Sequence, residues 1–316
     1  MWWLLKRTAI SVLLVWVVAS IVFAAIRLVP GDPAELLLSQ GGAAPDPAIV
    51  AQLHDQLGLN KPFLVQYVGS FRDLLSGDLG QSLQDQTPVA DEIMVRLPRT
   101  LELILAATII GMLSGIPAGT MAAAWRGGWF DRSASFIAAV SLAVPVFVVG
   151  TLLVLIFAQA LRWVPAGGYV PLAQAPGRHL LLLAMPAVTI GIGLGAAAFR
   201  MTRASVLDIT MRDYVRTARA KGLHPLRILL HHVLRNALMP VVTVLALNMG
   251  TLLGGTVLVE YVFNYPGLSG MLVDAVNARD YPEVQGIVLV ISILFVALNL
   301  LVDLLYAVLD PRVRHG

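Results

Sequence analysis

Six long stretches without a charged side chain constrain this fold more than any other feature of the sequence. They lie at residues 8–26, 103–125, 133–161, 179–199, 236–259 and 284–302. A helix of about 20 apolar residues crosses the hydrocarbon core of a bilayer, and only helices or closed barrels satisfy the backbone there. Barrel strands would alternate polar and apolar residues, and these stretches do not. We therefore predict an all-α polytopic membrane protein with six transmembrane helices.

The composition agrees with a membrane protein and excludes some chemistry. Only 13% of residues are charged, against about a quarter in soluble domains. The first stretch follows Lys6 and Arg7, as the apolar core of a signal peptide does. It is longer than such a core and lacks a small-x-small cleavage site before Pro30, so we expect a retained span. The chain has no cysteine, which excludes disulfides and thiolate chemistry.

The connecting segments differ in charge, which predicts an orientation. Residues 200–235 hold eight Lys and Arg against Asp208 and Asp213, whereas residues 30–98 hold nine acidic and three basic residues. Lys and Arg near span ends favour the cytoplasmic side. Both termini, the turn at 125–132 and the segment 200–235 are therefore predicted to be cytoplasmic. Only the loop after the third span, with Arg162 and Arg178, weakly opposes this assignment.

The long outer segment, residues 30–98, carries repeated signals for the start of a helix. Four residue pairs place a proline at a first helical position, and Gly58 and Gly77 stand where two of these helices would end. The pairs are Asp32-Pro33, Asp46-Pro47, Lys61-Pro62 and Thr87-Pro88. We predict two or three short amphipathic helices. They form either a structured connector or a docking surface for a soluble partner.

Glycines spaced four residues apart predict where the spans pack against each other. Small residues let helix backbones approach closely in lipid. The predicted packing glycines are Gly111, Gly115, Gly119, Gly191, Gly195, Gly250 and Gly254. Prolines lie in or at the ends of four spans, where they can kink a helix: Pro117, Pro145, Pro186 and Pro240.

Several activities lack the residues they require. No span carries an acid or base near its centre, which argues against a secondary transporter and, with it, a stand-alone channel. No G-x-x-x-x-G-K-[ST] loop occurs, so this chain is predicted to hold no nucleotide and to be no enzyme. "GLSG" around Ser269 resembles the G-x-S-G of rhomboid-type intramembrane proteases, but the only histidine in an apolar stretch is His179, at its edge. His231 and His232 are adjacent and cannot share one metal ion on one helix face.

The basic cassette between residues 214 and 240 is predicted to be a helical hairpin. Tyr214 to Lys221 favours a helix, Gly222 ends it, and His224-Pro225 starts a second helix. A basic hairpin on anionic lipid explains the charge, but it does not explain a helix break at one point. The alternative is a knob that fits into a groove of a partner protein.

The cassette and several other motifs resemble one family. "DYVRTARAKGL" is typical of the dipeptide/oligopeptide/nickel group of type I ABC importer permeases, and the chain is similar to its dipeptide-permease-B-like members. The motifs "PGDPAELL", "QLGLNKP", "GDLGQSL", "LPRTLEL", "VEYVFNYPGLSG", "RDYPEVQG" and "VDLLYAVLDPRVR" extend the resemblance over nearly all 316 residues. Against the general coupling pattern E-A-A-x3-G-x9-I-x-L-P, Ala218, Gly222 and Leu234 match. The glutamate is replaced by Arg216, and the isoleucine and proline also differ.

The resemblance implies a type I ABC importer permease fold in a bacterial inner membrane, with no catalytic, cofactor or metal site in this chain. The implied partners are a second homologous permease, two cytoplasmic ATPases that bind ATP and Mg, a periplasmic or lipid-anchored substrate-binding protein and membrane lipid, but no nucleic acid. The implied substrates are di- or oligopeptides, with nickel or another small solute as the alternative. The implied domains are residues 1–96 (first span and periplasmic helices), 97–309 (a five-helix core with a coupling loop at about 203–235) and 310–316 (a cytoplasmic tail). The residues implied to couple to the ATPase are Arg216, Thr217, Ala218, Arg219, Ala220, Lys221, Gly222, Leu223, His224 and Pro225.

Overall fold

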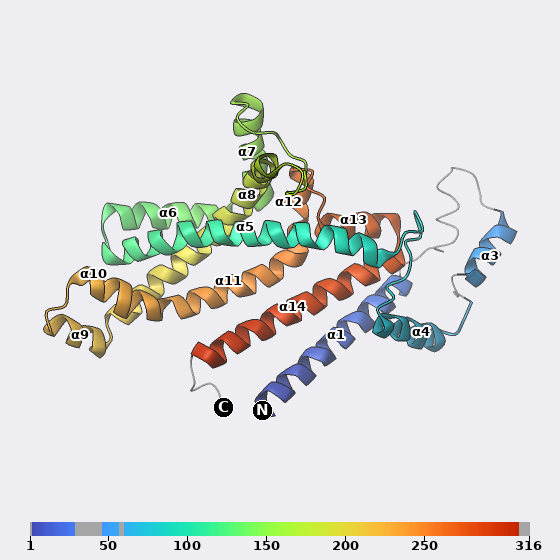
Figure 1. Ribbon diagram of the computed structural model, residues 1–316, viewed down its shortest axis with the longest axis horizontal. Helices are drawn as coiled ribbons and strands as arrows, with labels where there is room; N and C mark the ends of the chain where they lie inside the picture. Colours follow the sequence, from blue (N-terminus) through green and yellow to red (C-terminus); the bar gives the residue numbers. More distant parts are fainter. Residues whose placement is uncertain (1, 29–45, 57–59, 310–316) are drawn as a thin grey trace. The chain divides into compact units, whose positions relative to one another are not determined.

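The computed structural model describes residues 2–28, 46–56 and 60–309, and helices dominate these ranges (Figure 1). The chain forms two compact units. The first is Met1–Pro98 with Met271–Leu300, and the second is Arg99–Gly270 with Leu301–Gly316. These units cut across the sequence-based domains 1–96, 97–309 and 310–316, which stay predictions.

Five helices are long and apolar enough to cross a membrane, which agrees with five of the six predicted spans. A sixth span exists if two bent helices are counted together. The five helices are α1 (Trp2–Leu28), α5 (Val89–Ala124), α8 (Pro176–Thr210), α11 (Arg235–Gly255) and α14 (Tyr281–Leu309).

The predicted third span, residues 133–161, is not one straight helix. It consists of α6 (Trp129–Ala143), α7 (Val146–Leu153) and the π-helical turn η1 (Val154–Ala160), with a bend of 102° between α6 and the rest. Val144 is extended before Pro145, because a proline disfavours helical geometry in the residue that precedes it. Pro186 and Pro240 instead lie inside the continuous helices α8 and α11. Of these three prolines, only Pro145 breaks its span.

The first unit contains the outer helices predicted from proline and glycine signals. Asp46 Oδ1 accepts a hydrogen bond from the Ala48 N–H at 2.9 Å, just before α3 (Pro47–Gln56). Helix α4 (Phe63–Ser76) ends at Gly77, whose φ is +83°. Its Tyr67 hydroxyl lies 2.7 Å from Ser20 Oγ of α1, and the Tyr67 ring contacts Phe23 edge to face. These contacts hold α4 against the first span.

The predicted short helix after Thr87-Pro88 is part of a span instead. Helix α5 begins at Val89 and continues through Pro98 to Ala124. Thr87 Oγ1 donates a hydrogen bond to Glu92 Oε1 at 2.6 Å, which connects the residue before Pro88 with the first turn of α5. The start signal was therefore correct and the predicted length was wrong. The signals at Asp32-Pro33 and Gly58 lie outside the described residues.

Helix α8 is the centre of the second unit. Figure 1 shows α5, α6 and α11 beside it. The buried cluster that joins α5, α8 and α11 includes Leu103, Ile190, Leu194 and Leu245, and Ala138 of α6 packs on α8 in a second cluster. The broken helix α7 and the short helix α12 (Val257–Val262) contact α8 as well. Because several elements contact α8, a displacement of this helix would change packing contacts throughout the second unit.

Glycines of α5 lie directly against α8. A Cβ at Gly111 would lie 2.7 Å from Leu194 Cβ, and one at Gly119 would lie 2.9 Å from Thr202 Cβ. A Cβ at Gly115 would overlap the Gly195 carbonyl oxygen. These three predicted packing glycines therefore form one contact stripe.

The remaining predicted packing glycines differ from one another. A Cβ at Gly191 would lie 2.8 Å from Ile110 Cγ2, and one at Gly195 would lie 2.6 Å from Ser114 Oγ. Gly250 is buried within α11. Gly254 is exposed, and a Cβ there would meet no described atom within 4 Å. Within the described part of this chain, Gly254 therefore does not have its predicted packing role. It lies one residue before the end of α11 at Gly255.

Candidate functional site

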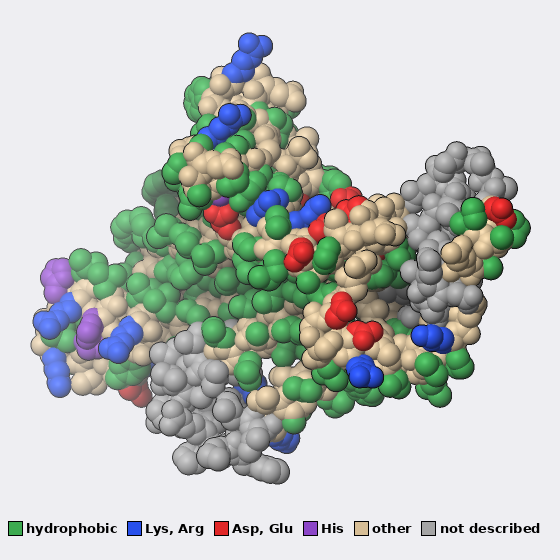
Figure 2. Space-filling view, turned by 45° about the vertical axis from the view of Figure 1, so that its right-hand side comes forward, with side chains coloured by type: hydrophobic (Ala, Val, Ile, Leu, Met, Phe, Trp, Pro, Cys, Tyr) green, Lys and Arg blue, Asp and Glu red, His purple; other side chains and the backbone are tan. Residues whose placement is uncertain are grey.

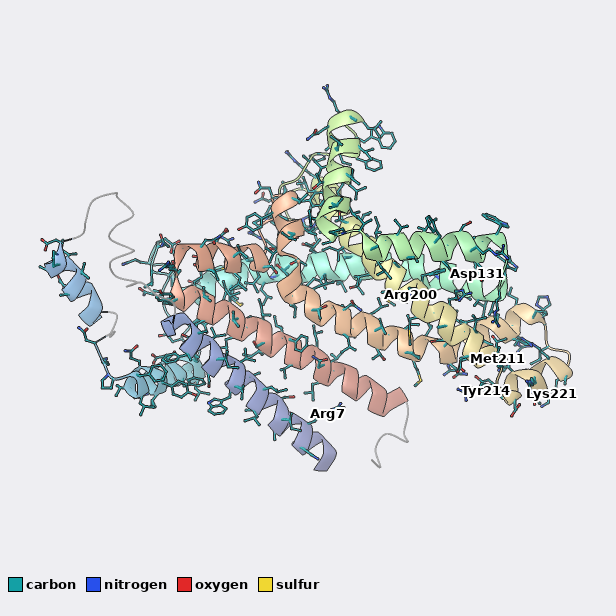
Figure 3. The ribbon with its side chains drawn as sticks, turned by 180° about the vertical axis from the view of Figure 1, so that it is seen from behind. Arg7, Asp131, Arg200, Met211, Tyr214 and Lys221 are labelled. Carbon is teal, nitrogen blue, oxygen red and sulfur yellow. The ribbon has the colours of Figure 1, made fainter. Side chains whose placement is uncertain are left out.

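The basic cassette forms the predicted hairpin, at one end of the second unit. Helix α9 (Asp213–Ala220) is followed by a turn, then by α10 (Pro225–Arg227) and the π-helical turn η2 (Ile228–Leu234), which leads into α11. Figure 3 shows the labelled Met211, Tyr214 and Lys221 together at this end. The long helix α8 enters the hairpin from the membrane-spanning side, so the hairpin joins two candidate spans.

Gly222 ends α9 through its backbone conformation. Its φ is +72°, a left-handed value that glycine adopts at low cost. The Gly222 N–H donates to the Arg219 carbonyl at 2.9 Å, and the Leu223 N–H donates to the Ala218 carbonyl at 3.4 Å. This pair of bonds is a Schellman motif, which satisfies carbonyls at a helix end. The helix break predicted at Gly222 is confirmed.

His224 and Pro225 start the second arm, as the sequence predicts. The Leu226 N–H donates a hydrogen bond to His224 Nδ1 at 3.3 Å. Pro225 occupies the first helical turn, where its missing N–H costs nothing. The turn between the two arms is consequently determined at both of its ends by local hydrogen bonds.

An apolar underside holds the hairpin on the ends of the spans. Buried side chains of α9 and η2 share one cluster with residues of α5, α8 and α11. Its buried members are Ala123, Val206, Val215, Ala218, Ile228, Val233 and Ala237. Asn236 Nδ2, in the first turn of α11, donates to the Tyr214 hydroxyl of α9 at 3.1 Å. The hairpin is therefore a packed element, attached to three long helices.

The opposite face of the hairpin is exposed. Eight of the ten predicted coupling residues are exposed, while Leu223 is half-buried and Ala218 belongs to the apolar cluster. Figure 2 shows Lys, Arg and His side chains gathered at this end. Four large side chains of the hairpin region are exposed too: Met211, Tyr214, Leu226 and Leu230. The coupling residues predicted from the sequence do not include these four. Exposed apolar groups beside charges are nevertheless typical of protein interfaces.

An ion pair between distant positions lies near the hairpin base. Arg203 of α8 donates two hydrogen bonds to the buried carboxylate of Asp131, at 2.5 Å from Nε and 2.8 Å from Nη2. The Gly127 N–H also donates to this carboxylate, at 2.9 Å. In the sequence, Arg203 lies in the basic segment 200–235 and Asp131 in the turn 125–132, and no local pattern signals their pairing.

The protease alternative finds no support in the geometry. The Ser269 hydroxyl is buried, 2.9 Å from both Thr256 Oγ1 and the Leu253 carbonyl oxygen. His179 instead lies 2.6 Å from Glu102 Oε1. Ser269 has no histidine hydrogen-bonded to it in the described structure, as a serine nucleophile requires. Among the described residues, no group of three His, Cys, Asp or Glu side chains could hold a metal ion.

Known proteins match this chain over its full length. The family described as "Binding-protein-dependent transport system inner membrane component" matches residues 115–315. The corresponding N-terminal family matches residues 1–104. The probable peptide ABC transporter permease protein y4tP of Sinorhizobium fredii is 39% identical over 314 residues, covering 99% of each chain. The glutathione transport system permease protein GsiC is 39% identical in Escherichia coli K12 and 40% identical in Salmonella choleraesuis, over 313 residues and 99% of each chain.

Proposed function

Because the chain belongs to the family of binding-protein-dependent transport system inner membrane components, we infer that its hairpin couples ATP hydrolysis to transport. The chain is the transmembrane permease subunit of a peptide-class ABC importer, with the type I permease fold. It is located in the inner membrane and is not itself catalytic, since the ATPase is a separate subunit.

The observation that carries the coupling role is the exposed segment from Arg216 to Pro225, which comprises the end of α9 and the turn after it. Local hydrogen bonds determine its shape at both ends, and its apolar underside is attached to α5, α8 and α11. A preformed knob loses little conformational entropy when it docks. We propose that this turn inserts into a groove of a cytoplasmic ATPase subunit, and that movement of the groove is transmitted to the spans through α8 and α11.

The positive charge of the hairpin indicates which side chains the ATPase groove should carry. Arg216, Arg219, Lys221 and Arg227 are exposed, and the nearest acid, Asp213, lies 3.6 Å from Arg216. An ATPase groove with acidic side chains complements this surface. The general coupling pattern has a glutamate where this chain has Arg216, so we propose that an acidic ATPase side chain faces Arg216.

The complete transporter contains more subunits than this one. The proposed assembly pairs this chain with a second similar permease, two ATPases that bind ATP and Mg, and a soluble or lipid-anchored binding protein on the outer side. Alternating access arises when closure of the two ATPases moves the two hairpins together. The binding protein docks on the outer side of the assembly.

The proposed substrates are di- or oligopeptides, which include the tripeptide glutathione. The two kinds of relative are named as peptide and glutathione permeases, and both solutes carry free carboxylates. Nickel uptake by the same machinery is the alternative that the family resemblance leaves open.

Gly222→Asp tests the coupling role, with Gly77→Asp as its matched control. Both glycines have positive φ and open space around a Cβ, so both substitutions impose a similar backbone cost of about 1 kcal/mol. Only Gly222 lies on the hairpin. The complex with its ATPases and binding protein is reconstituted in liposomes, and peptide uptake and ATP hydrolysis are measured together.

We expect Gly222→Asp to insert normally and to lower uptake per ATP hydrolysed, or to release the ATPase from the complex. A loss of about 1.4 kcal/mol in docking lowers assembly about tenfold. Gly77→Asp should keep both activities. Normal coupled uptake by Gly222→Asp would overturn the coupling role.

A further inference from the structure

Four side chains contact one another in sequence in the second unit, at the end of α8 opposite the hairpin: Arg99 contacts Tyr169, Tyr169 contacts His179, and His179 contacts Glu102. Arg99 and Glu102 lie three residues apart on α5, so they lie on the same helix face. Tyr169 lies in the segment between η1 and α8, and His179 lies in the first turn of α8. In the orientation predicted from charge, this is the outer end of the unit.

Arg99 is positioned by an aromatic ring instead of a carboxylate. Its Cζ lies 4.5 Å from the centroid of the Tyr169 ring, within the range of a cation–π contact. One guanidinium N–H reaches the Pro266 carbonyl oxygen, at a long 3.4 Å. Within the described ranges, no carboxylate forms an ion pair with Arg99. A guanidinium has five N–H donors, so most of the donors of Arg99 remain available to a ligand.

A hydrogen bond also fixes the backbone of Arg99. The buried Tyr265 hydroxyl donates to the Arg99 carbonyl oxygen at 3.1 Å. Burial raises the pKa of Tyr265 above its ordinary value, so this hydroxyl stays neutral and remains a donor. The Tyr265 ring also contacts Tyr169 edge to face, with centroids 5.6 Å apart. The direction of the Arg99 side chain is therefore set before any ligand arrives.

Glu102 forms its hydrogen bond with His179 and not with Arg99, although Glu102 and Arg99 share a helix face. Its Oε1 lies 2.6 Å from Nε2 of the buried His179. The other ring nitrogen, Nδ1, lies 2.7 Å from the Val170 carbonyl oxygen. A carbonyl only accepts hydrogen bonds, so Nδ1 carries a proton. The Glu102 carboxyl group is therefore engaged by His179.

The contacts of Arg99 leave its charge without a hydrogen-bonded carboxylate in the described structure. Its guanidinium contacts the Tyr169 ring and the Pro266 carbonyl oxygen, and the carboxyl group of Glu102 contacts His179 instead. Arg99 is only partly exposed, where a charge interacts more strongly than in bulk water.

We propose that Arg99 binds the free carboxylate of the solute during its passage through the permease. A guanidinium fixed in direction by an aromatic face can form a bidentate pair with a carboxylate. Tyr169, His179 and Glu102 are positioning residues: Tyr169 contacts the guanidinium, and His179 engages the Glu102 carboxyl group on the same helix face as Arg99. The proposal rests on the proposed peptide import and narrows it: the site favours solutes with a carboxylate and disfavours a metal cation such as nickel.

The test compares one peptide with a free C-terminal carboxylate and the same peptide as its C-terminal amide. Both are supplied to the complete reconstituted transporter at concentrations that saturate its binding protein, as measured by separate titration. The variants are Arg99→Gln, Arg99→Lys and the control Arg178→Gln, which removes the same charge from an exposed site beside His179. Initial uptake and ATP hydrolysis stimulated by the binding protein are recorded for each variant.

Loss of one charge-assisted contact should lower uptake of the free acid by about tenfold in Arg99→Gln. Uptake of the amide should change by about twofold or less, because it lacks the partner charge. Arg99→Lys should recover part of the uptake, and Arg178→Gln should change neither rate. Stimulated ATP hydrolysis should persist in all three variants, which separates a contact with the solute from a failure to fold.

An equal fall for acid and amide in Arg99→Gln would overturn the proposal, and so would undiminished uptake of the acid. Failure of the unaltered transporter to import any peptide would instead contradict the proposed peptide import. The two failures are therefore distinguishable.

Discussion

Arg203 of α8 and Asp131 at the start of α6 form a bidentate ion pair, although 72 residues separate them. The pair attaches the turn between α5 and α6 to α8, and the labelled Asp131 marks this turn in Figure 3. One helical turn further along α8, Val206 joins Ala123 and the hairpin residues in one apolar cluster. The turn, the end of α8 and the hairpin base are consequently connected by a continuous set of contacts.

Asp131→Asn should destabilise the protein, because it leaves the Arg203 guanidinium without its anion. Breaking a buried ion pair costs about 3–5 kcal/mol, and the partial exposure of Arg203 reduces this to roughly 2 kcal/mol. The check is thermal unfolding of the purified protein in detergent. Asp208→Asn is the control, since its pair with Arg212 is 2.9 Å long but exposed on both sides. A similar loss in both variants would show that burial of the pair contributes nothing.

Gly115→Ala should weaken the packing of α5 on α8. The added Cβ would overlap the Gly195 carbonyl oxygen and lie 2.7 Å from Ala198 Cβ. Such overpacking typically costs about 1–3 kcal/mol. Gly193→Ala is the matched control on α8, where a Cβ meets nothing within 4 Å and alanine favours the helix by about 0.5–1 kcal/mol. Unfolding midpoints should therefore move in opposite directions, and a shift in the same direction would contradict the proposed contact stripe.

Glu260→Gln should loosen the loop between α12 and α13 (Leu268–Ala278). The buried Glu260 carboxylate accepts hydrogen bonds from Thr256 Oγ1 at 2.8 Å, Thr100 Oγ1 at 3.1 Å and the Gly270 N–H at 2.6 Å. An amide in its place turns a donor toward one of these donors, at a cost of about 1–3 kcal/mol. Hydrogen exchange of the Gly270 amide should accelerate by about tenfold or more.

Glu260→Asp, which keeps the charge but shortens the side chain, serves as the comparison for Glu260→Gln. Gly267 lies so close to the Glu260 carboxylate that a Cβ added at this position would overlap the carboxylate. Unchanged exchange at Gly270 in both variants would show that the carboxylate does not hold the loop.

The sequence predicted features that depend on one or two neighbouring residues. The hairpin turn followed from Gly222 and His224-Pro225, because positive φ and a proline at a helix start are local requirements. The end of α4 at Gly77 is of the same kind. Five candidate spans followed from hydropathy alone, since lipid imposes their length and composition.

Features that depend on tertiary contacts could not be predicted. Pro145 breaks its span while Pro186 and Pro240 do not, and proline chemistry is the same in all three. The helix predicted after Thr87-Pro88 is the first part of α5, which continues without a break through Pro98. The pairing of Asp131 with Arg203 and the group around Arg99 join residues from separate helices, which no local pattern specifies. The exposed apolar side chains Met211 and Leu226 became candidates only when their exposure was known.

The most direct test of the coupling role uses the absence of cysteine from the chain. Single cysteines are introduced at the exposed Lys221 on the hairpin and at the exposed Trp163 beyond η1, and each is labelled with a photoreactive cross-linker in the assembled transporter. We expect Lys221→Cys to cross-link to an ATPase subunit and Trp163→Cys not to do so. If Lys221→Cys instead labels only lipid in a complex that still hydrolyses ATP and imports peptide, the hairpin is not the element that docks to the ATPase.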